Sequence, residues 1–241
     1  MKSHLLLLVL TLGLPCSLWA REPSSLAPAA VSADEALRRL QDGNGRFVSG
    51  QVEHPRADRG RLQDTSTSGQ HPFAIVISCS DSRVPPEIIF DQGVGDVFVV
   101  RVAGNVVGAH EIGSAEYALE HLATQLLVVL GHTGCGAVAA AVSGGEVHGN
   151  VASIVEIIRP AVAEAQRTHP KLHGKDLMPA AVEANVWNSA HKLVQLSSVV
   201  RDLAHDGKLK IVGGVYDIAT GKVSWLGESS NVTTKAATSQ R

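Results

Sequence analysis

The sequence is poor in aromatic residues, in cysteine and in clustered charge. Aromatic side chains make up only 4% of its 241 residues, which disfavours an aromatic-rich β-sandwich, and its many small residues favour close packing of helices on a sheet. The formal net charge of −2 and the lack of a basic block argue against binding to nucleic acid or to an anionic membrane surface. The length suits one domain with a full hydrophobic core.

The N-terminus predicts export. Met1–Ala20 has a basic start, an apolar run and a small final residue, as in a secretory signal peptide, and the run is short for a membrane span. We therefore expect a periplasmic or secreted protein, with an uncleaved N-terminal anchor as the alternative. We expect 21–32 to form a flexible start of the mature chain, 33–228 to form the folded domain and 229–241 to form a polar tail.

Removal of the signal peptide leaves only Cys79 and Cys135 of the three cysteines. In an oxidising compartment two such cysteines form one disulfide by default. Each of them, however, lies in a polar motif that a disulfide does not need. Asp81 and Arg83 follow the first, and His132 stands three residues before the second. The pattern favours a metal site, and a disulfide between the two cysteines is the alternative.

Unbroken apolar runs alternate with helical patterns along the chain. Such runs are typical of strands covered on both faces, and strands separated by helices form right-handed crossovers in a parallel sheet. The fold class is therefore α/β, with a central, mostly parallel β-sheet flanked by helices. The predicted strands are 73–77, 97–100, 126–130 and 209–212, with 222–226 as an antiparallel edge strand. The predicted helices are 33 to about 43 (ended by Gly43 to Gly45), 113–123, 135–142, 152–167 and 179–206, with room for a short helix within 51–70.

Candidate metal ligands follow two of these strands. Cys79 follows the first strand, and His132 and Cys135 follow the third, so their loops meet if the two strands are neighbours. Two thiolates and one imidazole suit zinc, which takes four donors. Asp81 would close the site or lie beside a bound water, and Arg83 would hold its carboxylate through a bidentate pair.

A zinc ion in this setting lowers the pKa of its water to about 7 and yields hydroxide near neutral pH. We expect Asp81 to accept the hydrogen bond of that hydroxide. Two thiolates reduce the effective charge on zinc compared with three neutral histidines, so we expect the activity to rise with pH.

The motif Cys-Ser-Asp-Ser-Arg-Val at 79–84, paired with His-Thr-Gly-Cys-Gly at 132–136, resembles the zinc motifs of β-class carbonic anhydrases. These enzymes interconvert carbon dioxide and bicarbonate with zinc. The resemblance runs from about Asp34 to Leu226. It implies the β-carbonic anhydrase fold with an N-terminal helical arm and one Zn²⁺ per subunit. It also implies a homodimer or dimer of dimers with clefts at the subunit interface.

The resemblance includes the substrate cleft of the plant-like subtype. Gln70, Phe98, Tyr117 and Gly136 match that cleft by local motif and offset. There the family uses the glutamine amide, from across the dimer, to polarise substrate oxygen, and the two aromatic residues as apolar walls. On spacing alone Phe98 and Tyr117 are as well explained as core residues and Gln70 as a surface residue, so these assignments depend on the resemblance.

The other subtype resembles this chain less. It has a tryptophan three residues before the first zinc cysteine, as part of a non-catalytic bicarbonate site. This chain has Val76 there, although Arg101 and Tyr216 resemble the other two members of that site.

Two other functions fit the same ligands. One is an enzyme of the same fold that hydrolyses carbon disulfide or carbonyl sulfide, since it could carry the same zinc site. The other is a non-catalytic protein stabilised by zinc, in which Asp81 is a permanent fourth ligand.

Overall fold

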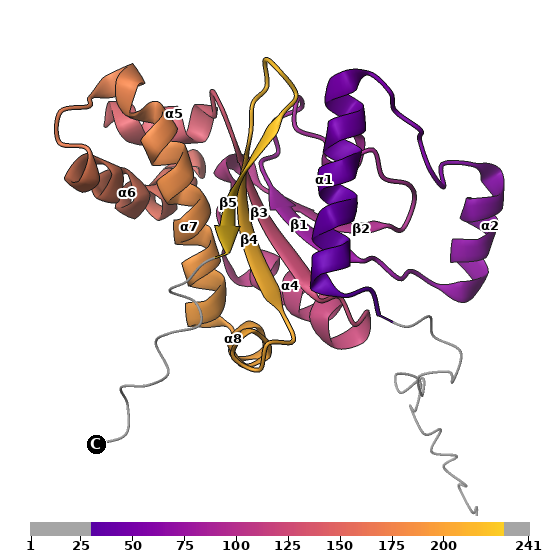
Figure 1. Ribbon diagram of the computed structural model, residues 1–241. Helices are drawn as coiled ribbons and strands as arrows, with labels where there is room; N and C mark the ends of the chain where they lie inside the picture. Colours follow the sequence, from indigo (N-terminus) through magenta and orange to yellow (C-terminus); the bar gives the residue numbers. More distant parts are fainter. Residues whose placement is uncertain (1–29, 229–241) are drawn as a thin grey trace, which may run out of the picture.

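The computed structural model describes residues 30–228, which form a five-stranded sheet with helices on both faces (Figure 1). The predicted signal peptide (1–20), most of the predicted flexible segment (21–29) and the predicted tail (229–241) lie outside the described residues. Within 30–228, no helix combines the length and the apolar character that a membrane crossing needs.

The order of elements alternates strands with helices, as predicted. The helices are α1 (Ala33–Ser49), α2 (Arg59–Ser68), α3 (Pro86–Ile89), α4 (Ala109–His121), α5 (Gly136–Ser143), α6 (Val151–Thr168), α7 (Met178–Leu196) and α8 (Ser198–His205), with 3-10 turns η1 (Ala103–Asn105) and η2 (Gly174–Leu177). The strands are β1 (Ala74–Ser78), β2 (Val97–Arg101), β3 (Leu126–His132), β4 (Lys210–Tyr216) and β5 (Val223–Glu228).

The strand order is β2-β1-β3-β4-β5. The first four strands pair in parallel, and β5 pairs antiparallel with β4 at one edge. The predicted fold class, a mostly parallel sheet flanked by helices, is therefore confirmed. Because β1 and β3 are neighbours, the loops that follow them leave the same edge of the sheet.

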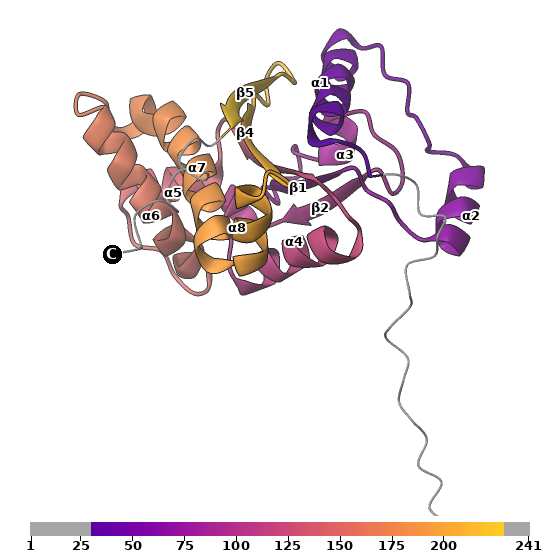
Figure 2. The same ribbon diagram turned by 60° about the horizontal axis from the view of Figure 1, so that its bottom comes forward.

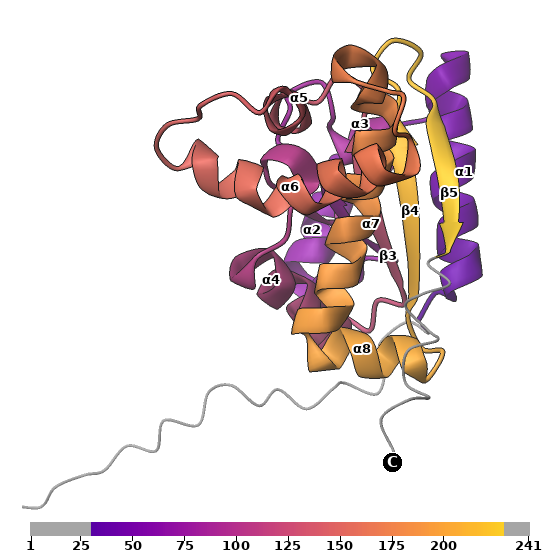
Figure 3. The ribbon, with the colours of Figure 1, turned by 90° about the vertical axis from the view of Figure 1, so that its left-hand side faces the viewer.

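Alternate residues of the central strands pack against opposite helical layers. Ile75 and Ile77 of β1 pack in one cluster with α4, α7 and α8, whereas Ala74 and Val76 pack in another with Leu40 of α1. Figure 3 shows α1 on one side of the sheet and α4, α6 and α7 on the other. Every residue of β1 and β3 is buried, which explains why their sequences are apolar without alternation.

The prediction that the first helix ends near Gly43 to Gly45 is wrong. Helix α1 continues to Ser49 and ends at Gly50, which has left-handed backbone angles. The cause is tertiary packing, because the absent side chain of Gly43 lets the helix approach the Phe90 carbonyl. The next residue, Asn44, is buried and bonds to backbone groups of Ile89, Gly221 and Val223.

The prediction of one helix over 179–206 is also wrong. Ser197 has extended backbone angles (φ −112, ψ 121) and separates α7 from α8. Its hydroxyl caps α8 by accepting from the Val200 amide and donates to Glu116 of α4. Helix α4 itself begins about one turn earlier than predicted, where Glu111 accepts from the amide of Gly108.

We predict that alanine has opposite effects at the two glycines of α1. A Cβ on Gly43 would lie 1.8 Å from the Phe90 carbonyl oxygen, whereas a Cβ on Gly45 meets nothing within 4 Å. Gly43→Ala should lower the free energy of unfolding by about 1–3 kcal/mol or more. Gly45→Ala should raise it by about 0.5–1 kcal/mol, because alanine favours the helix. Urea denaturation measures both, and equal effects would contradict the packing argument.

Candidate metal centre

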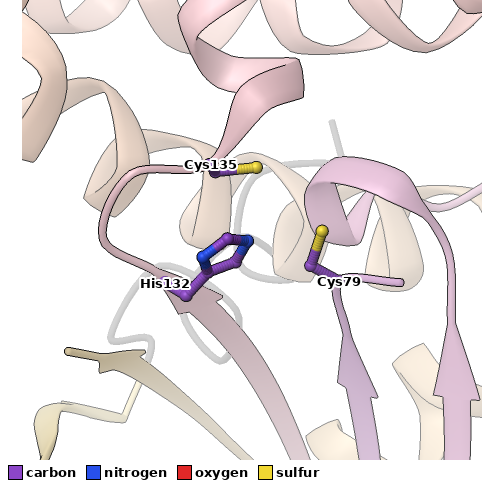
Figure 4. Close-up of side chains that lie close together, drawn as sticks. All are labelled: Cys79, His132 and Cys135. Carbon is purple, nitrogen blue, oxygen red and sulfur yellow. The ribbon is translucent and has the colours of Figure 1, made fainter. Parts of the chain in front are cut away.

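Three candidate ligands converge at the carboxyl edge of the sheet. Cys79 directly follows β1, His132 is the last residue of β3, and Cys135 is the N-cap of α5. All three are buried, and the two sulfurs and a ring nitrogen lie within 4.8 Å of one another. Figure 4 shows the three side chains pointing toward a common centre. Parallel pairing of β1 with β3 thus brings together residues more than fifty positions apart in the sequence.

The histidine ring is prepared to bind a cation. Its Nδ1 donates to the Thr133 carbonyl oxygen at 3.0 Å, so the free electron pair is on Nε2. His132 is 0% exposed, and within the described residues its Nε2 has no hydrogen-bond partner. An unsatisfied buried nitrogen costs about 1–3 kcal/mol, and a metal ion bound by Nε2 would remove that cost.

The two cysteines are buried and free, with no disulfide between them. The pKa of Cys79 is lowered, first because the Cys135 thiol stabilises its thiolate, and the amides of Asp81 and Gly104 donate to the same sulfur. The pKa of Cys135 is raised, first by the adjacent Cys79 thiolate and then by burial. Ionising both thiols therefore requires a cation between them. Two thiols and one imidazole nitrogen at this spacing fit zinc.

A carboxylate lies beside this cluster. Asp81 Oδ2 is 4.0 Å from His132 Nε2, and its side chain is 18% exposed, so it reaches both the cluster and solvent. Arg83 holds it in a bidentate pair, with Nε to Oδ1 at 2.9 Å and Nη2 to Oδ2 at 2.7 Å. These hydrogen bonds, helped by the Arg83 amide, hold the pKa of Asp81 well below its usual range. The carboxylate is therefore ionised at neutral pH and can only accept hydrogen bonds.

The loop after β2 supports the cluster from a third element. Gly104 of η1 donates its amide to Cys79 Sγ at 3.2 Å, and the Asn185 side chain on α7 donates to the Gly104 carbonyl at 2.7 Å. Gly104 has a φ of +71, and a Cβ there would lie 2.8 Å from Ile158. Asn185 was not among the residues predicted for the site. Its signal is an asparagine on the apolar face of a long predicted helix.

The residues compared with the bicarbonate site of the other subtype have structural roles in this chain. Arg101 is the last residue of β2, and it donates to the carbonyl oxygens of Cys79 and Asp81. It thereby fastens the loop that carries the first candidate ligand. Val76, which stands where the other subtype has tryptophan, is fully buried against α1, and Tyr216 is buried at the end of β4.

The structure places the predicted cleft residues in two groups. Gly136 is the first residue of α5, next to Cys135. Gln70 is exposed and precedes β1, at the end of the strand opposite Cys79. With five residues in β1, at about 3.3 Å each, roughly 16 Å of strand separates these two ends.

Phe98 and Tyr117 also lie away from the cluster of their own chain. Phe98 pairs with Ile75, three residues before the last pair of β1 with β2. Its ring centroid is 6.2 Å from that of Tyr117, which is 46% exposed. The two rings therefore form an aromatic patch beside the outer strand β2, and one chain does not bring them to the metal ligands.

Comparisons with known proteins point in one direction. The sequence pattern of the family described as "Carbonic anhydrase" matches residues 74–223. The carbonic anhydrase of Mycolicibacterium smegmatis is 40% identical over 82% of this chain and 96% of its own length. Carbonic anhydrase 2 of Mycobacterium tuberculosis is 38% identical over 78% of this chain and 89% of its own.

Solved structures agree with these relatives. The β-carbonic anhydrase CcaA has a TM-score of 0.62 at 30% identity, with 78% of this chain and 94% of that chain covered. The β-carbonic anhydrase CafA of Aspergillus fumigatus has a TM-score of 0.64 at 27% identity, with 83% and 93% covered.

We predict that the purified chain carries one zinc ion and, after denaturation with a chelator, shows both Cys79 and Cys135 as free thiols. Cys135→Ser and His132→Asn should each bind clearly less than one zinc ion per chain, because each removes one donor of the cluster. The control His110→Asn changes an exposed histidine of α4 and should keep the zinc. Elemental analysis measures the zinc content, and thiol titration counts the free cysteines. A chain without metal and without free thiols would contain the alternative disulfide instead.

Proposed function

The chain belongs to the β-carbonic anhydrase family, and from that membership we propose that it hydrates carbon dioxide to bicarbonate, reversibly, with one zinc ion per subunit. The residues that would hold the zinc are Cys79, His132 and Cys135. The observation that carries the proposal is the convergence of these three buried donors beside a carboxylate that stays ionised.

When bound, zinc supplies Lewis acidity that makes water nucleophilic near neutral pH. Asp81 supplies orientation: its ionised carboxylate would accept a hydrogen bond from the attacking water, which leaves the oxygen lone pair directed at the carbon of the substrate. Arg83 keeps that carboxylate in place through two hydrogen bonds and keeps it ionised. Asp81 Oδ2 lies 4.0 Å from His132 Nε2, so the same carboxylate could instead serve as the fourth ligand and close the site.

We propose that the active unit is a homodimer, alone or paired with a second dimer. Gln70, Phe98 and Tyr117 match the substrate cleft of the family, yet they lie away from the cluster of their own chain. A second copy related by a two-fold axis would bring them to it. Strand β2 is at the edge of the sheet, so its free side is available to that copy.

Helix α2 supports the same assembly. It has no buried residue, and it stands apart from the sheet in Figures 1 and 2. Its position is nevertheless fixed, because Arg61 bonds to the Val94 carbonyl and Arg56, just before the helix, pairs with Asp96. A short polar helix gains most of its stability from packing. Helix α2 has no buried residue within its own chain, so it is suited to pack against a partner subunit.

We also propose the plant-like subtype and an exported protein. The subtype is supported by Val76, which leaves no aromatic side chain at that position, and by Arg101, whose guanidinium bonds to two carbonyl groups of the metal loop. Export to the periplasm or the medium is supported by the signal peptide predicted for Met1–Ala20.

Carbon dioxide hydration by zinc-loaded protein, followed by stopped-flow with a pH indicator, tests the proposed reaction. Asp81→Asn should keep its zinc and lower kcat/KM by about 100-fold or more, because an amide presents a donor as well as an acceptor and loses the charge. The control Asp202→Asn changes an exposed aspartate on α8 and should leave kcat/KM unchanged.

The same assay separates the alternatives. No hydration with zinc fully loaded would overturn the carbonic anhydrase reaction, and hydrolysis of carbonyl sulfide or carbon disulfide would then identify the related hydrolase. If neither gas reacts and Asp81→Asn only weakens zinc binding, the site is a non-catalytic one that Asp81 closes.

A mixing experiment tests the shared cleft. Gln70→Ala and His132→Asn chains should each be weakly active alone. In a heterodimer, the intact metal cluster of the Gln70→Ala chain would lie beside the intact Gln70 of the His132→Asn chain. Random reassortment should therefore restore about one quarter of the parental activity, since half of the dimers then hold one complete cleft of two. No recovery in verified heterodimers would place glutamine and cluster in the same chain.

A further inference from the structure

The loop that carries His132 and Cys135 is fastened to the turn between β4 and β5. We propose that the Thr133 hydroxyl and the Asp217 carboxylate are positioning residues that preset His132 for zinc. This inference rests on the zinc site of the proposed function. Neither group touches the cluster, and both act through the backbone of Thr133.

Thr133 is held by three hydrogen bonds to consecutive residues of one segment. Its amide donates to the Tyr216 carbonyl at 2.9 Å, and its Oγ1 donates to Asp217 Oδ1 at 3.3 Å. The same Oγ1 accepts from the Ile218 amide at 3.1 Å. The hydroxyl thus uses both its donor and its acceptor on the β4–β5 turn, so both the backbone and the side chain of this residue are fixed.

The carbonyl of this fixed residue is the group that orients the histidine. It accepts from His132 Nδ1 at 3.0 Å, which selects the ring tautomer with its electron pair on Nε2. A rotation of the Thr133 peptide would turn this carbonyl away from the ring. The three bonds to the turn hold the preceding peptide, the Cα and the side chain of Thr133 in place, which limits the movement of its carbonyl relative to the ring and favours one tautomer and one direction of Nε2. Groups that orient a ligand in this way change metal affinity by about 10-fold to 100-fold.

Asp217 is itself rigidly placed. Its Oδ1 also accepts from the Ala219 amide at 2.9 Å, and its Oδ2 accepts from Thr220 Oγ1 at 2.9 Å. Its backbone exchanges hydrogen bonds with Gly221 and Lys222 across the turn. Hydrogen bonds, that from the Ala219 amide first, lower the pKa of Asp217. The turn is therefore a preformed acceptor, 84 residues away in sequence from the threonine that it holds.

The test is the zinc dissociation constant of metal-free protein, measured by competition with a chromophoric chelator at one pH. Thr133→Val keeps the branched shape but loses the hydroxyl, and its dissociation constant should rise about 10-fold. Thr133→Ser keeps the hydroxyl and should stay within about 3-fold of the parent. Thr124→Val is the matched control, since it removes a threonine hydroxyl that also makes a tertiary hydrogen bond, to the Pro72 carbonyl at 3.1 Å, but before the opposite end of β3, and it should leave zinc affinity at the parental level.

A second measurement reports on the histidine directly. In metal-free protein labelled with ¹⁵N-histidine, NMR should show His132 protonated on Nδ1 in the parent and in Thr133→Ser. Thr133→Val should show a mixture of tautomers. If Thr133→Val does not fold, Asp217→Asn replaces it, and its loss of the carboxylate should give an intermediate loss of zinc affinity.

Equal zinc affinity for Thr133→Val and Thr133→Ser, or equal losses in Thr133→Val and Thr124→Val, would overturn this inference and leave the proposed function intact. Unchanged zinc affinity in Asp217→Asn would do the same where that variant is the one measured. A parent chain that takes up no zinc would overturn the proposed function and this inference together.

Discussion

Parallel pairing of β1 with β3 sets the geometry of the candidate metal centre. In this pairing Ile75 lies opposite Leu127 and Ser78 lies opposite Leu130, so the two strands reach the same edge of the sheet together. Both strands are completely buried, and a shift of register would move apolar residues to the wrong helical layer. The hydrophobic core therefore determines the distance between Cys79 and the His132 loop, and with it the metal centre.

The strands bring the ligands together, but loops from other elements orient them. The Gly104 amide, held by Asn185 of α7, reaches the Cys79 sulfur, and the β4–β5 turn holds Thr133 and through it His132. These contacts satisfy backbone groups that would otherwise be unpaired beside buried thiols. The centre is thus supported by elements on both sides of the two ligand strands.

The chain divides its candidate functional residues between two regions of the sheet. The candidate metal ligands, with Asp81 and Arg83, lie at the carboxyl edge of the central strands. The aromatic patch of Phe98 and Tyr117 lies beside the outer strand β2, and Gln70 lies at the start of β1. In the proposed dimer these residues would complete the cleft of the partner subunit, which would link formation of the cleft to dimerisation.

The α/β class, the strands and the candidate ligands could be predicted from the sequence, because buried strands and a pair of metal motifs are local patterns. It could not show that α1 passes through Gly43, or that Asn44 bonds to groups as far along the chain as Val223. Nor could it show the break at Ser197 or the bond between Thr133 and Asp217. These features follow from tertiary packing, because each depends on groups that are distant in sequence and become neighbours when the sheet and its helices pack.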